Sequence, residues 1–191
     1  MRAALLAAAG ELLHTEGRSA VSVRRVAEAV GTTTRAVYSV FGDKDGLLRA
    51  LSEDVAETMR RHHEDIPERD DPIAEIVELA FGYRAAALEK PNLYGVFFDE
   101  VRVDADTNDA LFALVYRSFE RVLRTVRRGL AAGLFPGRAE GDVGRSLFAM
   151  VHGLASLELR GILGDDASAR RIWRQSVEAL LNGLRQPPAP G

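Results

Sequence analysis

Apolar residues recur at every third or fourth position through most of the chain, the spacing that gives a helix one buried face. No stretch of useful length alternates apolar with polar residues as a strand does, and no internal repeat is apparent. Glycines, prolines and capping residues divide the pattern into segments. We therefore predict an all-α fold. The expected helices cover residues 3–16, 23–30, 34–40, 43–65, 72–90, 91–99, 108–132, 140–161 and 167–184.

Two short helices separated by a tight turn are expected between Ser22 and Phe41. Ser22 is a suitable N-cap for the first helix, and Gly31 is a suitable residue to end it. Thr32 and Thr33 are both plausible N-caps for the second helix. The pattern predicts a helix-turn-helix.

The second helix of this pair is too short to be stable by itself, so apolar side chains must anchor it. We expect Val37, Val40 and Phe41 to be these anchors. The outward side then carries hydroxyls, which can reach DNA phosphates, and an arginine, which can form two hydrogen bonds with guanine. The expected DNA-binding residues are Ser22, Arg24, Thr33, Thr34, Arg35, Tyr38, Ser39 and Lys44.

Several of these side chains also have a purely structural interpretation. Ser22 and Thr33 would then be only helix caps, and Tyr38 would only pack; a cap at a DNA-facing helix start can serve both purposes. Lys44 would be an ordinary solvated lysine. A cation at the start of the 43–65 helix is unfavourable for the helix dipole, which favours a phosphate partner instead.

The net charge of −3 argues against a general affinity for nucleic acid, but the charge is unevenly spread. Through Gly46 there are six basic and five acidic residues, a balance of +1, whereas the remainder has 19 against 23, a balance of −4. DNA binding would therefore depend on a few well-placed contacts and weaken as salt rises. No run of Lys or Arg precedes the first helix, so either the head works without a basic arm or the start is incomplete.

The helices expected at 140–161 and 167–184 are apolar over more than one narrow stripe. We expect them to pair with the same helices of a second subunit in a four-helix interface. The alternative is complete burial within one chain, since wide apolar helices also form ordinary domain cores. The side chains expected in the interface are Leu147, Leu154, Leu157, Trp173, Val177, Leu180 and Leu181. Residues 187–191 are expected to be a disordered tail.

Aromatic residues are concentrated in the central helices. They either pack the helical core or line an apolar cavity for a small molecule. His152 lies on an otherwise apolar helix, where it either orients a polar ligand group or is an ordinary core histidine. The expected ligand-binding residues are Phe81, Tyr94, Phe97, Phe98, Phe112, Tyr116, Phe119, Met150 and His152.

Catalytic and metal chemistry find little support. The chain has no cysteine, which excludes thiol catalysis and fits a reducing cytoplasm. His62 and His63 are adjacent and diverge by about 100° on a helix, so they cannot share one metal ion. Neither a Gly-rich phosphate loop nor a serine elbow is present, and no window approaches a membrane span. We expect a cytoplasmic protein that is not an enzyme and uses no metal or cofactor.

Several features of the first quarter of the chain occur together at fixed offsets. They are Ala8-Ala9, Leu12, Gly17, the run from Ser22 to Ala27, Val30-Gly31, Val37-Tyr38, Phe41, Lys44 and Leu47-Leu48. Together they resemble the DNA-binding head of the tetracycline-repressor (TetR) type of bacterial transcription regulators, with more specificity than a lone motif. Two positions depart from such heads. Val40 replaces a frequent His, which removes a phosphate contact, and Arg35 replaces a small residue, which can add a base contact.

The triplet Val151-His152-Gly153 resembles the ligand-binding subtype named for a Trp-His-Gly triplet, with Val in place of Trp. The resemblance implies a homodimer that binds a two-fold-related double-stranded DNA site, its heads about 34 to 36 Å apart. A small effector would move the heads out of register with successive major grooves. The expected organisation is a helix-turn-helix head at 1–46, a linking helix at 43–65 and a ligand-binding and dimerisation domain at 66–186.

The sequence therefore predicts a ligand-responsive transcription regulator, a repressor released from its operator by a small, mostly apolar effector. The alternative is a helical small-molecule-binding protein or enzyme with a vestigial DNA-binding head. The nearly neutral head and the missing basic arm favour this alternative.

Overall fold

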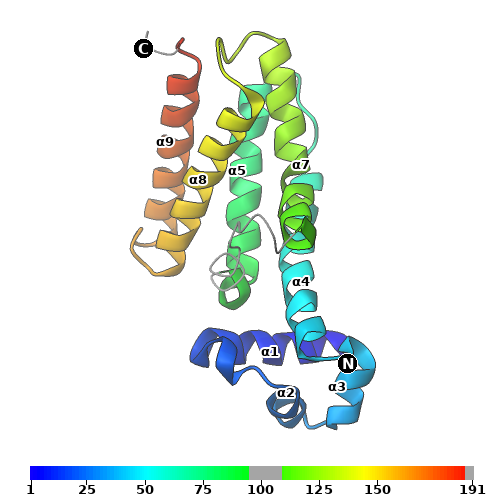
Figure 1. Ribbon diagram of the computed structural model, residues 1–191. Coiled ribbons are helices and arrows are strands. Elements are labelled where there is room, and N and C mark those ends of the chain that lie inside the picture. Colours follow the sequence, from blue (N-terminus) through cyan, green and yellow to red (C-terminus); the bar gives the residue numbers. More distant parts are fainter. Residues whose placement is uncertain (95–108, 188–191) are drawn as a thin grey trace. The chain divides into compact units, whose positions relative to one another are not determined.

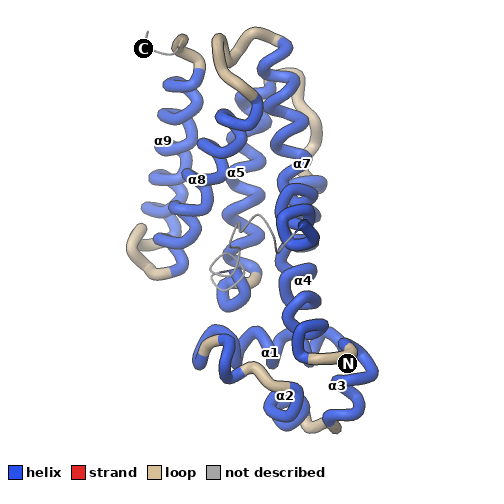
Figure 2. Tube along the Cα trace, viewed as in Figure 1, coloured by secondary structure: helices blue, strands red, loops and turns tan. Residues whose placement is uncertain are grey.

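The structure is a computed structural model that describes residues 1–94 and 109–187, without the side chains of Arg18 and residues 109–116. All regular secondary structure in these residues is helical (Figure 1, Figure 2), which confirms the predicted all-α fold. The chain forms two compact units. The head unit comprises Met1–Thr58 and Lys90–Tyr116, and the C-terminal unit comprises Met59–Glu89 and Arg117–Gly191.

The head unit is built from short helices around one apolar core. Its elements are α1 (Arg2–Glu16), the 3-10 turn η1 (Arg18–Ala20), α2 (Val23–Val30), α3 (Thr34–Phe41) and the beginning of α4 (Lys44–Glu64). The helical residues 91–94 also join this core through Leu93. The core includes Leu5, Leu6, Ala9, Leu13, Val23, Val26, Val37, Leu47 and Leu51.

The anchoring of α3 differs from the prediction at one position. Val37 is completely buried, and Phe41 packs against the core as expected. Val40, the third expected anchor, is instead 38% exposed. Val40 and Phe41 flank Val37 on the helix surface, at three and four residues from it, and the head core covers only the side on which Phe41 lies. The expectation for Val40 was wrong.

The junction between α3 and α4 requires a glycine that the sequence pattern did not single out. Asp43 caps α4 as its side chain accepts a hydrogen bond of 2.6 Å from the backbone N–H of Gly46. A Cβ at Gly46 would lie only 1.9 Å from the carbonyl oxygen of Phe41. The missing side chain therefore allows the end of α3 to approach the first turn of α4.

Replacing Gly46 by Ala should destabilise the head, because the added methyl would overlap the Phe41 carbonyl and force a backbone shift. We expect a loss of about 1 to 3 kcal/mol in the free energy of unfolding, measured by urea denaturation. Gly141→Ala is the control, since a Cβ there would meet only the mobile end of the Arg145 side chain. Equal stability of the two variants would contradict this account of the junction.

The C-terminal unit is a bundle of longer helices. Besides the end of α4 it contains α5 (Pro72–Glu89), α7 (Asp109–Ala131) from Arg117 onward, α8 (Glu140–Leu159) and α9 (Asp166–Leu184). Helices α5, α8 and α9 contact one another and run side by side (Figure 1). None of the helices in the described ranges has both the length and the hydropathy needed to cross a bilayer.

A fully buried carboxylate joins α5 to α7. Glu75 accepts hydrogen bonds from the hydroxyl of Thr125 at 2.5 Å and from the backbone N–H of Arg69 at 2.8 Å. Its carboxylate also pairs with the guanidinium groups of Arg121 and Arg128. Burial by itself would raise the pKa of Glu75, but these hydrogen bonds outweigh it and lower the pKa to about 2.

A second buried network joins α5, α8 and α9. The guanidinium of Arg84, only 4% exposed, donates to Glu158 at 2.9 Å and to Asp166 at 2.6 Å. The indole N–H of Trp173 donates to the same Glu158 carboxylate at 2.7 Å. Removing one member would leave a buried charge or polar group without its partner, so the network fixes how these helices pack.

The structure corrects five of the residues expected in a subunit interface. They are buried in the core of the C-terminal unit itself: Leu147, Leu154, Trp173, Val177 and Leu181. Each of α8 and α9 has an inward apolar stripe that packs within the bundle, so these side chains are not available to a partner. Of the expected interface residues, Leu157 is 39% exposed and Leu180 is half-buried.

Replacing Glu75 by Gln should flatten the dependence of stability on pH in acid. A pKa lowered from 4.5 to about 2 gives stabilisation that is present above pH 4.5 and is lost as the pH falls towards 2. Within that range the wild type should lose up to about 1.4 kcal/mol per pH unit more than Glu75→Gln in urea unfolding. Glu178→Gln changes an exposed carboxylate on α9 and should keep the wild-type slope. An unchanged slope in Glu75→Gln would refute the role of this carboxylate.

Candidate DNA-binding helix and effector site

The capping residues of the helix-turn-helix lie where the sequence predicts them. The Ser22 side chain caps α2 by accepting from the backbone N–H of Arg25 at 3.3 Å. The Thr33 side chain caps α3 by accepting from the backbone N–H of Ala36 at 3.2 Å. Between the two helices Gly31 adopts the left-handed conformation, with φ of 69°, which is why a glycine ends α2.

The outer side of α3 is exposed and polar. Thr33, Thr34, Arg35 and Ser39 are exposed, and Tyr38 is 53% exposed. An exposed large aromatic ring on a short helix is not needed for the core. The arrangement leaves hydroxyls, a guanidinium and a phenol on one accessible surface, which suits contact with DNA phosphates and base edges.

The two neighbouring arginines of α2 have different surroundings. Arg25 holds α2 to the end of α1 through two hydrogen bonds to the Glu16 carboxylate, at 2.9 and 2.6 Å. This guanidinium lowers the pKa of Glu16 below its ordinary value. Arg24 has a looser pair with Glu28 at 3.4 Å, and its side chain is 80% exposed. Arg24 is therefore the arginine of α2 whose side chain is the more accessible. Lys44 and Ser22 are half-buried.

The expected effector residues whose side chains are described do not line one cavity. Phe97 and Phe98 lie outside the described residues, as do the side chains of Phe112 and Tyr116. Tyr94 is 1% exposed and belongs to the head unit.

In the C-terminal unit, Phe119 contacts the buried ring of His63 edge-on, with the ring centroids 6.1 Å apart. His152 is half-buried and stacks on Phe148 at 5.7 Å. Met150 is half-buried. Leu147 and Val151 of the same helix line a small cavity beside His63, but Met150 does not.

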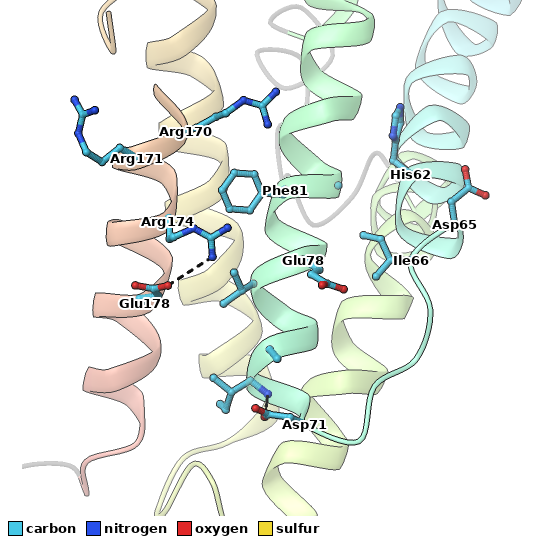
Figure 3. A pocket seen from close by; sticks show the side chains of 14 residues that line it. His62, Asp65, Ile66, Asp71, Glu78, Phe81, Arg170, Arg171, Arg174 and Glu178 are labelled. Atoms are coloured by element: carbon cyan, nitrogen blue, oxygen red, sulfur yellow. Dashed lines mark hydrogen bonds and ion pairs between the residues drawn. The ribbon is translucent and has the colours of Figure 1, made fainter. Parts of the chain in front are cut away.

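Phe81 lies in a wide open groove between α5 and α9, with a volume of about 1170 Å³ (Figure 3). The guanidinium of Arg174 sits over the Phe81 ring at 5.3 Å from its centroid. Both acidic and basic side chains surround this groove, including Glu78 and Glu178 as well as Arg170. Such an open surface with charges of both signs does not resemble an enclosed apolar effector site.

A small cavity with mostly apolar walls lies beside His63 in the C-terminal unit. Its volume is about 10 Å³, and its walls include Leu79, Tyr83, Phe119 and Val122. We call it the His63 cavity. From the sequence, His63 is only a poor metal ligand, whereas Tyr83 is one of the aromatic residues of the central helices that could line an effector site. A histidine within an apolar helical stripe was the only signal, and core packing explains most such residues.

No described residues form a cluster of three His, Cys, Asp or Glu side chains that could hold a metal ion. The head, in contrast, has the features of a bacterial helix-turn-helix regulator: two capped helices, a left-handed glycine between them and an exposed polar second helix.

Comparison with known families agrees with this class. Residues 5–51 match the family described as bacterial regulatory proteins of the tetR family, and residues 76–180 match the tetracyclin repressor-like C-terminal domain. The chain belongs to the TetR family. Members of this family are transcriptional regulators rather than enzymes, which confirms the prediction that the chain is not an enzyme. The Trp-His-Gly subtype stays a prediction.

Solved structures share the fold at low sequence identity. The TetR family transcriptional regulator PfmR from Thermus thermophilus is 21% identical with a TM-score of 0.76, over 100% of this chain and 98% of that one. A protein of unknown function from a Rhodococcus species is 24% identical with a TM-score of 0.76, over 97% and 95%. The fatty acid degradation regulator FadR from Bacillus halodurans is 15% identical with a TM-score of 0.74, over 97% and 96%. A comparison with proteins of curated function finds no match.

Proposed function

We propose that the chain is a cytoplasmic, homodimeric repressor that leaves its operator when a small, mostly apolar effector binds the C-terminal unit. The observation that carries the proposal is the polar outer side of α3, anchored by the buried Val37 and capped by Thr33. Family membership supplies the class of activity, transcription regulation. The Trp-His-Gly subtype, on Val151-His152-Gly153, and the expected domain limits at residues 46 and 66 belong to the same proposal.

The proposed DNA contacts divide into positioning and sequence reading. Thr33, Thr34 and Ser39 carry hydroxyls suited to phosphates, as does the exposed Arg24 with its guanidinium. Arg35 is the strongest candidate for reading a base, since it is exposed on α3 and a guanidinium matches the major-groove edge of guanine. Heads of this type often have His at the position of the exposed Val40. The operator sequence of a relative with His there therefore does not predict the operator of this protein.

The proposed dimer uses the outward sides of α8 and α9. Their inward stripes are buried, and part of each outward side is uncharged: Met150, Gly153 and Leu157 on α8, and Ala179 and Leu180 on α9. A Cβ added at Gly153 would meet nothing within 4 Å, so the helix presents an open notch there. A two-fold axis would bring these self-complementary surfaces together and present two α3 helices to one DNA site.

DNA binding is tested by gel shift with the DNA upstream of the protein's own gene, in low salt. Specific complexes that weaken as salt rises support the regulator. The rival, a small-molecule binder or enzyme with a vestigial head, predicts no retention on heparin and turnover of an aromatic or acyl compound. Failure to bind any neighbouring intergenic segment would count decisively against a repressor.

Replacing Arg35 by Ala should weaken operator binding by about 1 to 3 kcal/mol and relax the preference at one base pair, because a bidentate contact to guanine is lost. Titrations of the operator and of operators changed at single base pairs measure both effects. Arg145→Ala is the control, since Arg145 is a 78% exposed arginine of the C-terminal unit. Equal losses on operator and random DNA would show that Arg35 touches only phosphate.

Replacing Leu157 by Arg should convert the dimer into a monomer, because a charge would be placed at the centre of the proposed interface. Sedimentation equilibrium measures the change. Leu88→Arg is a matched control: Leu88 on α5 is 41% exposed, close to the 39% of Leu157, but lies outside the proposed interface. A dimeric Leu157→Arg variant, or a monomeric wild type, would overturn this assignment.

A further inference from the structure

The His63 ring is buried, but only one of its two nitrogens has a hydrogen-bond partner. The side chain is 1% exposed, and its Nδ1 lies 3.0 Å from the carbonyl oxygen of Ser118. Its Nε2 is buried and has no hydrogen-bond partner in the described structure. Almost all buried polar atoms in proteins have a partner, so an unpaired ring nitrogen calls for an explanation.

The partner of Nδ1 determines the chemical character of Nε2. A carbonyl oxygen can only accept a hydrogen bond, so Nδ1 must carry the proton. Burial lowers the pKa of His63 more than the backbone carbonyls of Ser118 and Leu79 beside the ring raise it, and the ring is therefore neutral at neutral pH. A neutral ring protonated at Nδ1 has a bare lone pair at Nε2. Nε2 is thus an acceptor that lacks a donor.

The side chains that surround the His63 ring are apolar and aromatic. The ring of Tyr83 lies nearly parallel to His63 with centroids 6.4 Å apart, and that of Phe119 meets it edge-on. Phe148 contacts both of these rings at an angle of 82°. Aliphatic side chains such as Leu79 and Leu147 complete the described wall of the His63 cavity. Flat apolar groups suit such walls.

The position of the ring is fixed by a close approach of two helices. A Cβ at Gly82 of α5 would lie 3.0 Å from the carbonyl oxygen of His62 and 3.4 Å from the His63 ring. The glycine therefore lets α5 lie directly against the end of α4, where His63 is held. The unpaired nitrogen is a consequence of this packing rather than of a loose side chain.

We propose that the His63 cavity is the effector site and that it selects a neutral, largely aromatic molecule that donates one hydrogen bond to Nε2 of His63. A phenol or an aryl N–H has this chemistry. The proposal rests on the ligand-responsive function above and specifies its ligand. At about 10 Å³ the cavity holds at most about one water molecule, so an effector must push its aromatic walls apart to enter.

The proposal discriminates between ligands of almost equal shape. A purely apolar cavity would prefer toluene to phenol, because toluene is the less polar of the two. A cavity with an unpaired acceptor should prefer phenol, since only phenol satisfies Nε2. Benzoate should be rejected, because its carboxylate has no proton to donate and would bring a charge into an apolar site.

The test is a titration of the full-length wild type with phenol, toluene and benzoate, followed by calorimetry. We expect phenol to bind on the order of tenfold more tightly than toluene and benzoate not to bind. In His63→Phe the order should reverse, with toluene preferred. Leu88→Ala changes an exposed residue of α5 outside the cavity and should keep the wild-type preference. A wild-type preference for toluene, no binding of either probe, or loss of the preference in Leu88→Ala would overturn the proposal.

A measurement on the wild type keeps the proposal testable if His63→Phe does not fold. The chain has four histidines, so selective ¹⁵N labelling of their rings gives resolvable signals. We expect an unprotonated Nε2 for His63 that shifts on addition of phenol but not of toluene; equal shifts would contradict the hydrogen bond. Neither measurement uses DNA. A negative result for phenol therefore does not contradict operator binding, and a negative gel shift does not contradict the preference for phenol over toluene.

Discussion

An isolated helix of eight residues does not hold together in water, and the account of this protein depends on how α3 is held. One fully buried side chain, Val37, fastens the helix to the head core. The Thr33 side chain accepts a hydrogen bond from a backbone N–H of the first turn of α3. The absence of a side chain at Gly46 lets the last turn of α3 approach α4. Because so little of α3 is used for anchoring, the side with Thr34, Arg35, Tyr38 and Ser39 remains polar and accessible, which is what DNA recognition requires.

Local chemistry in the sequence was sufficient to predict much of the head. Caps such as Ser22 and Thr33, and the glycine at position 31, act within one turn of the chain, so their roles follow from neighbouring residues. Val40 was assigned to the core because it is apolar, yet nothing in the sequence says which of two adjacent apolar residues a neighbouring helix covers. Gly46 was missed for a similar reason, since its close contact with Phe41 arises only after α3 and α4 meet.

The C-terminal unit could be predicted less well, because its decisive contacts join distant parts of the chain. Glu75 and Thr125 are 50 residues apart in the sequence, and Arg84 and Glu158 are 74 residues apart. No local sequence pattern therefore predicts either buried network. Apolar periodicity predicted α8 and α9 but could not say whether Trp173 faces the same chain or a partner. The unpaired nitrogen of His63 likewise becomes visible only when the positions of Ser118 and the aromatic walls are known.

The central claim is that a two-fold dimer presents two α3 helices to successive major grooves of one operator. The most direct test is the affinity of the wild type for its operator after insertion of about 5 base pairs, half a helical turn, between the half-sites. The insertion carries the second half-site to the opposite side of the duplex, and we predict that affinity falls to the level of non-specific DNA. Undiminished affinity for the lengthened operator would contradict the claim.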